Sequence, residues 1–195
     1  MVRIDRDLAE RTLASLPLSS GPRTFADWWL SQIGIDGEPL PLEGIEPLRA
    51  EIALYALTFE VRHWSTILCR SCGANFISAL QIDLTGRDML ALVSPAHRQT
   101  RLTRFVRVAQ GGLQFSYREV VTADGMKHQL QELLVPHPDS RVSPLEPTAS
   151  MVVAYIDASA AFLGKHVLVS RGALEVSDEP QFVDLRPKSM VGPPA

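Results

Sequence analysis

Residues 72–93, read as CGANFISALQIDLTGRDMLALV, constrain the fold of this chain more than any other stretch. They contain two short apolar segments, residues 76–80 and 89–93, joined by a tight DLTG turn at residues 83–86. A glycine at the end of that turn suits a backbone conformation with positive φ. Helical segments this short do not bury their own apolar side chains. We therefore expect both segments to lie as short helices across a β-sheet that the rest of the chain forms.

The residues before this stretch alternate in the manner of β-strands. Residues 54–61 and 65–71 are rich in β-branched and aromatic side chains, and the three residues between them predict a hairpin. Farther along, residues 151–157 (MVVAYID) are apolar on both faces, which is typical of a central strand covered on each side.

A second hairpin is predicted around Asp124-Gly125, a dipeptide typical of tight turns between strands. The flanking residues, 114–121 and 128–135, alternate between apolar and polar side chains. Together with the first hairpin and the apolar strand, they predict an α+β fold. We expect a five-stranded antiparallel sheet with helices packed on one face.

The chain divides into three regions. Residues 1–50 read as an N-terminal helical region with a proline-rich connection, in which Trp28 and Trp29 widen the apolar face of one helix. Residues 51–158 form the sheet domain, whose longest helix begins at Ser94-Pro95 and ends before two glycines. Residues 159–195 read as a C-terminal extension that we expect to be partly disordered.

Charge and composition exclude several classes of partner. The net charge of −3 gives no reason to expect nucleic acid. No apolar run approaches the roughly 20 residues that span a bilayer, and the polar N-terminus does not resemble a signal peptide, so we expect a cytoplasmic protein. Cys69 and Cys72 are too few for a structural zinc site. Packed, reduced cysteines are favoured over a redox pair.

Four pieces of the sequence carry a family resemblance: FADWW at residues 25–29, PLP at 39–41, CRSCG at 69–73 and DLTGR at 83–87. The chain resembles the PAS superfamily over about residues 24–157, and most closely a PAS-like family of small alphaproteobacterial proteins. The resemblance implies a sensory or regulatory module in which a curved sheet and its helices enclose a pocket. It also implies signalling through a dimer or a partner, and it names no cofactor or ligand.

The second hairpin supplies the candidate pocket. If Asp124-Gly125 makes a two-residue turn, Phe115 faces Leu134, Tyr117 faces Glu132 and Glu119 faces Leu130. Glu119 or Glu132 then hydrogen-bonds a ligand, or pairs with Arg70 or Arg87 to hold the DLTGR turn on the sheet. The ion pair is the favoured alternative. The candidate ligand-binding residues are Phe76, Leu80, Arg98, Leu102, Phe105, Phe115, Tyr117, Glu119, Leu130 and Glu132, and the structural turn residues are Asp83, Gly86 and Arg87.

Three functions are compatible with these residues. The first is a sensor that binds a small molecule in the pocket. The second is a ligand-free adaptor or homodimer that docks through the helix bearing Trp28 and Trp29. The third, an enzyme, is not favoured because no matched acid–base pair is evident, and we assign no catalytic or metal-binding residue. Haem binding through His97 is not favoured either, because that side chain points away from the apolar stripe of its helix.

Overall fold

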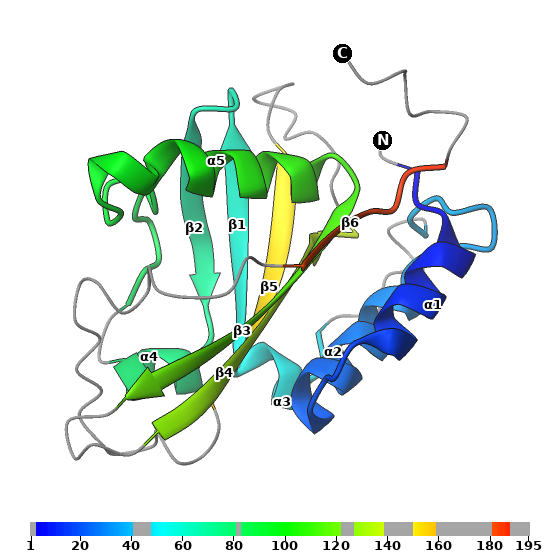
Figure 1. Cartoon of the computed structure of the whole chain (residues 1–195), viewed down its shortest axis with the longest axis horizontal. Helices are drawn as coiled ribbons and strands as arrows, with labels where there is room; N and C mark the ends of the chain where they lie inside the picture. Colours follow the sequence, from blue (N-terminus) through cyan, green and yellow to red (C-terminus); the bar gives the residue numbers. More distant parts are fainter. Residues whose placement is uncertain are drawn as a thin grey trace.

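The computed structural model describes residues 3–40, 48–80, 83–121, 127–138, 150–158 and 181–187. Within these ranges, the side chains of residues 79–80, 117–121, 127–130, 150–151 and 153–158 are not described. Figure 1 shows one twisted sheet with a long helix across one face and the N-terminal helices beside the other. The α+β class expected from the sequence is confirmed.

The elements follow the order α-α-α-β-β-α-α-β-β-β-β. The helices are α1 (Arg6–Ser15), α2 (Ser20–Ser31), α3 (Ala50–Ala53), α4 (Ala74–Leu80) and α5 (Pro95–Ala109). The strands are β1 (Ala56–Arg62), β2 (Thr66–Cys72), β3 (Gly112–Val121), β4 (Lys127–Pro136), β5 (Ser150–Ala158) and β6 (Gln181–Asp184). No helix in the described part of the chain is both long enough and apolar enough to cross a bilayer.

The sheet has six strands in the order β2-β1-β5-β4-β3-β6, rather than the expected five. The apolar strand β5 lies centrally between β1 and β4, as its composition predicts. The sixth strand, β6, comes from the C-terminal extension and pairs with the start of β3. Residues 181–187 of the C-terminal extension are therefore held against the sheet. Leu185 has no exposed surface, and its carbonyl accepts a hydrogen bond of 2.6 Å from the backbone of Asp5.

Helices cover both faces of the sheet, not one face as predicted (Figure 1). Alternation along β1 separates the two cores, because Ala56 packs with α1 and α2 whereas Leu57 and Phe59 pack with α5. Trp28 and Trp29 lie inside the first core, with 5% and 1% of their surface exposed. Of the two surfaces on which the sequence allows this helix to dock, the domain's own sheet and a partner, the structure shows the sheet, so these two tryptophans are not available to anchor a partner.

The DLTGR segment lies against the edge strand β2. Asp83 accepts a hydrogen bond of 2.8 Å from the backbone of Thr85, and Gly86 adopts a φ of 77°. The backbone N–H of Gly86 then donates to the carbonyl of Cys69 at 2.8 Å, and that of Cys69 donates to the carbonyl of Arg87 at 3.0 Å. These bonds satisfy backbone groups that an edge strand would otherwise leave open. Residues 89–93 form successive turns rather than the predicted second helix.

Candidate functional site

The hairpin of β3 and β4 has a register that differs by one residue from the predicted one. Ser116 pairs with Glu132 and Phe115 pairs with Leu133, whereas the sequence predicts Phe115 opposite Leu134. β3 ends at Val121 and β4 begins at Lys127, so the connection is longer than the two-residue turn that we expected. The residues of that turn lie outside the described part of the chain. A register shift of one residue moves every side chain of one strand to the other face of the sheet, relative to the side chains of the paired strand.

This register divides the predicted pocket residues between the two faces. Phe115 and Leu133 belong to the core beneath α1 and α2, so Phe115 is not part of a site under α5. Leu134 belongs to the core beneath α5. Alternation along β3 and β4 therefore places Gln114, Ser116 and Glu132 on the α5 face.

These three residues, which we call the polar triad, are buried. Gln114 and Ser116 are each 3% exposed and Glu132 is 9% exposed. The Ser116 hydroxyl donates a hydrogen bond of 2.8 Å to Glu132 Oε2. Gln114 Oε1 has no hydrogen-bond partner among the described atoms. A buried acceptor left in this state costs about 1–3 kcal/mol, so a ligand that donates to Gln114 would recover that free energy.

Aromatic and aliphatic side chains fill the space between α5 and the sheet. The rings of Phe59 and Phe105 pack edge to face, with centroids 5.1 Å apart and an interplanar angle of 86°. Phe76 is buried in the same core, and Leu102 packs against it while partly exposed. Three of the candidate residues, Phe76, Leu102 and Phe105, are thus brought together beneath α5.

The remaining candidates do not join this group in the described structure. Arg98 is exposed, and its Nε donates a hydrogen bond of 3.2 Å to the carbonyl of Val93, so it does not reach a pocket. Leu80, Tyr117, Glu119 and Leu130 lie in helices or strands, but their side chains are outside the description.

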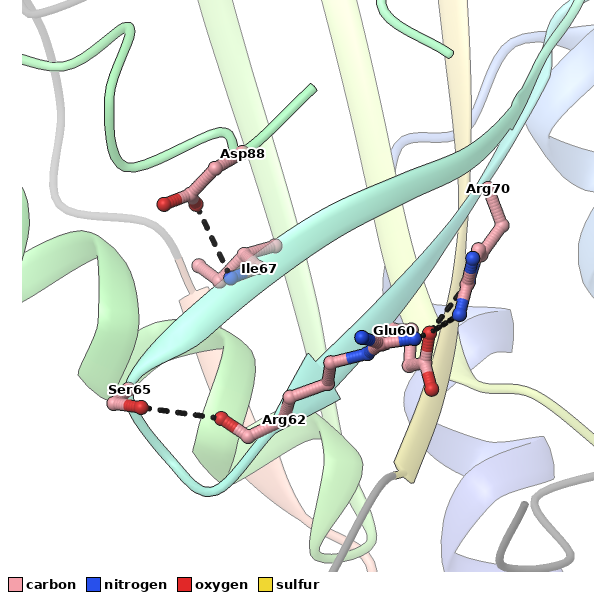
Figure 2. Close-up of polar contacts among 6 residues, drawn as sticks. All are labelled: Glu60, Arg62, Ser65, Ile67, Arg70 and Asp88. Carbon is pink, nitrogen blue, oxygen red and sulfur yellow. Dashed lines mark hydrogen bonds and ion pairs between the residues drawn. The ribbon is translucent and has the colours of Figure 1, made fainter. Parts of the chain in front are cut away.

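Arg70 pairs with Glu60, not with Glu132 as one prediction held (Figure 2). Glu60 is 3% exposed, and its Oε2 accepts from Arg70 Nε at 2.5 Å and lies 3.1 Å from Arg62 Nε. Arg70 is the extra residue at an irregularity in the pairing of β1 with β2. Glu60 is not among the site residues predicted from the sequence. The sequence signal for it is a single carboxylate within an apolar strand, with one arginine two residues later, Arg62, and another on the partner strand, Arg70.

Arg87, the other predicted ion-pair partner, lies near Asp83 instead. Hydrogen bonds from the backbone and side chain of Thr85 hold the pKa of Asp83 below its ordinary value, and the Arg87 charge adds to this effect. The turn residues therefore stabilise one another at the edge of the sheet. They do not hold a carboxylate of the polar triad.

The two cysteines fit a packing role. Both are free thiols, and burial, followed by the charges of Cys72 and Asp83, raises the pKa of Cys69 to about 12. Burial also raises the pKa of Cys72. Three residues along a strand span roughly 10 Å, whereas a disulfide joins Cα atoms about 4.4–6.8 Å apart. The described residues also contain no group of three His, Cys, Asp or Glu side chains that could hold a metal ion.

The chain is similar to known solved structures at a low level of sequence identity. No protein-family model matches the chain, and no curated protein matches it. Among solved structures it is similar to the PAS domain of a protein from Colwellia psychrerythraea, at 9% identity and a TM-score of 0.32, over 53% of this chain and 86% of that one. It is also similar to a fungal LOV domain photoreceptor, at 12% identity and a TM-score of 0.35, over 61% and 82% of the two chains. Likeness at this level identifies no ligand or activity for this chain.

A surface groove lies away from the polar triad, where the N-terminal segment meets residue 187. It has a volume of about 450 Å³ and is lined by Arg3, Ile4, Asp5, Arg6, Asp7, Ile35, Asp36, Gly37 and Pro187. Arg3 and Arg6 donate to the carbonyls of Asp36 and Ile33, at 2.8 Å and 2.6 Å. The two guanidinium groups therefore hold the loop at residues 33–37 in place.

Proposed function

We propose that this chain is a PAS-like regulatory module that binds a small molecule at the polar triad beneath α5 and signals through contacts with a partner. The carrying observation is the buried Gln114 Oε1, which has no hydrogen-bond partner among the described atoms. It lies on the same face of β3 as Ser116, whose hydroxyl already bonds Glu132. A ligand suited to this site presents an N–H or O–H donor to the amide oxygen and an apolar body to the core.

The role that we propose is binding without catalysis, in the cytoplasm. General acid–base catalysis needs two groups with pKa values matched to proton transfer. The Ser116 hydroxyl, which donates to Glu132, does not titrate near neutral pH and so does not supply a matched second group. The pair is suited to orient a ligand, because a hydroxyl that donates to the carboxylate still has lone pairs that accept.

The resemblance in the DLTGR segment supports the regulatory part of the proposal. In the structure this segment covers the edge strand β2 and leads through residues 89–93 into α5. A ligand beneath α5 would therefore contact the helix that the DLTGR segment connects to the edge strand β2. Because one face of α5 is exposed, a change in its position would alter the surface that a partner contacts.

Native mass spectrometry of protein purified from its own host tests this proposal. We expect wild type to retain a small molecule that Gln114→Leu and Glu132→Gln protein both lack. Gln110→Leu, an exposed position just after α5, is the matched control and keeps the ligand. The proposal fails if no preparation carries a ligand and Gln114→Leu unfolds at higher urea than wild type, since the amide would then be only a buried polar defect.

A ligand-free adaptor is the second candidate, and the packing of Phe59 against Phe105 favours it. These rings fill the space between β1 and α5 from both sides. Phe105→Ala separates the two functions. The enlarged space should increase the affinity or range of bound ligands in a sensor, whereas in an adaptor it should only lower the stability, by about 3–5 kcal/mol.

A further inference from the structure

We propose that the tip of the β1–β2 hairpin, residues 62–65, is a docking site for a protein partner whose surface is acidic around an apolar recess. Trp64 is the anchor that enters this recess. The inference concerns a different surface from the polar triad and does not depend on a ligand there. Figure 1 shows the hairpin turn emerging beyond α5, at one end of the sheet.

The backbone of the tip is strained. His63 and Trp64 have φ values of 47° and 51°, and the N–H of Ser65 donates to the carbonyl of Arg62 at 2.9 Å. Residues 62–65 therefore form a β-turn whose two central residues lie in the left-handed region, a conformation that Asn-Gly adopts readily. Residues other than glycine are strained in this region, and a bulky tryptophan is an outlier there. Trp64 is therefore unfavourable for forming this turn, which indicates that its side chain is present for another reason.

Exposure singles out the same residue. Trp64 is 41% exposed, whereas Trp28 and Trp29 are 5% and 1% exposed. Tryptophan and arginine are the residues most enriched among those that dominate binding energy at protein interfaces. Arg62, directly before the turn, has 32% of its side chain exposed. The tip thus combines a rigidly presented aromatic ring with a cation.

Charge defines the partner. Arg62 and Arg70 both approach Glu60, which is buried, so these three residues carry one net positive charge (Figure 2). α5, which packs on β1 and β2 among other strands, carries Arg98, Arg101 and Arg104 before its last turn and no acidic residue, whereas its fourth arginine, Arg107, lies over the Phe182 ring at the opposite edge of the sheet. Complementary charge steers association and fixes orientation. The surface that fits this end is therefore acidic, with an apolar recess for the indole.

Tryptophan emission tests the proposal, because Trp64 is far more exposed than Trp28 and Trp29. The probe is a synthetic helical peptide of leucine and glutamate with one apolar and one acidic face. A matched peptide with lysine in place of glutamate, and vesicles of phosphatidylserine, serve as alternative probes. We expect the glutamate peptide to shift the emission to shorter wavelength in a saturable manner, with binding that weakens as salt is raised.

Two variants separate docking from folding. His63→Asn with Trp64→Gly should raise Tm by on the order of 3–6 °C, because the strain is relieved, and should weaken peptide binding at least about tenfold as read by anisotropy of labelled peptide. Trp64→Ser should weaken binding similarly. Leu92→Ser, at another exposed apolar side chain that is 52% exposed, is the control and leaves binding unchanged.

The remaining outcomes overturn the proposal. A double variant with lower Tm shows that the turn is not strained. Equal binding by wild type and Trp64→Ser shows that Trp64 is not the anchor. Vesicles that bind through Trp64 while the peptide does not would indicate a membrane surface. Self-association that requires Trp64, without peptide binding, would indicate a second copy of this chain.

Discussion

The Ser116 hydroxyl donates a hydrogen bond of 2.8 Å to Glu132 Oε2, across β3 and β4 on the face that α5 covers. The two residues are directly opposite each other in the sheet, and both are buried. Their contact exists only in the observed register, because the predicted one places Tyr117 opposite Glu132. One residue of register therefore decides which groups face the candidate ligand site.

Removal of the Ser116 hydroxyl should destabilise the fold. In Ser116→Ala protein the buried carboxylate of Glu132 loses a donor, and we expect the free energy of unfolding to fall by about 1–3 kcal/mol. Urea denaturation followed by circular dichroism measures the change. Ser15→Ala, which removes an exposed hydroxyl bonded to Thr12, should change the stability by less than about 0.5 kcal/mol. Equal stability of the two variants would contradict the importance of the pair.

The pair of Glu60 and Arg70 should behave as a coupled unit. Arg70→Met leaves the buried carboxylate with one guanidinium fewer, and we expect a loss of about 1–2 kcal/mol, limited because 43% of the Arg70 side chain is exposed. Glu60→Leu combined with Arg70→Met removes both charges and should recover most of that loss. Urea denaturation of the single and double variants completes the cycle. A double variant whose loss equals the sum of the losses in Glu60→Leu and Arg70→Met would show that the two residues act independently.

The C-terminal strand should contribute to the global stability of the sheet. Leu185→Ala empties a fully buried position beside α1, and we expect a loss of about 2–4 kcal/mol from the missing contacts and the cavity. Thermal and urea unfolding should remain single transitions, because the residue belongs to the main core. Gln181→Ala, at the exposed start of β6, is the control and should have little effect. Wild-type stability in Leu185→Ala would mean that β6 is dispensable.

Alkaline pH should destabilise the protein through Cys69. The pKa of its thiol is about 12 in the folded chain, above the unfolded value near 8.5. The neutral thiol therefore contributes its full stability below about pH 8.5, and this contribution is lost as the pH rises toward 12. We expect the urea midpoint to fall between about pH 9 and 11 in wild type and to fall less in Cys69→Ala.

Reactivity checks the same thiol. At pH 8, iodoacetamide should modify half-buried Cys72 before buried Cys69 in the folded protein. In urea, where both thiols are exposed, the two should react at comparable rates. Mass spectrometry measures both reactions. Rapid modification of Cys69 in the native protein would contradict the pKa assigned to it. A reversible disulfide between the two cysteines would contradict the separation that their strand imposes.

Local signals in the sequence predicted the elements that depend on nearby residues. Ser94-Pro95 marked the start of α5 and the glycines after residue 110 marked its end, because capping is decided within one turn of helix. The DLTG turn followed from an aspartate that accepts a backbone N–H two residues on and a glycine with positive φ. The hairpin of β1 and β2 followed from alternation alone.

The sequence by itself determined the α+β class, the central place of the apolar strand β5 and the edge turn, since each is set by composition or by contacts within a few residues. Only the tertiary structure decided the register of β3 with β4, the burial of Trp28 and Trp29 and the addition of β6. The physical reason is common to all three. A register shift of one residue exchanges the two faces of a strand, and local sequence patterns do not report which distant segment of the chain packs against an element. Packing of the whole sheet against α5 on one side and α1 and α2 on the other selects among these alternatives.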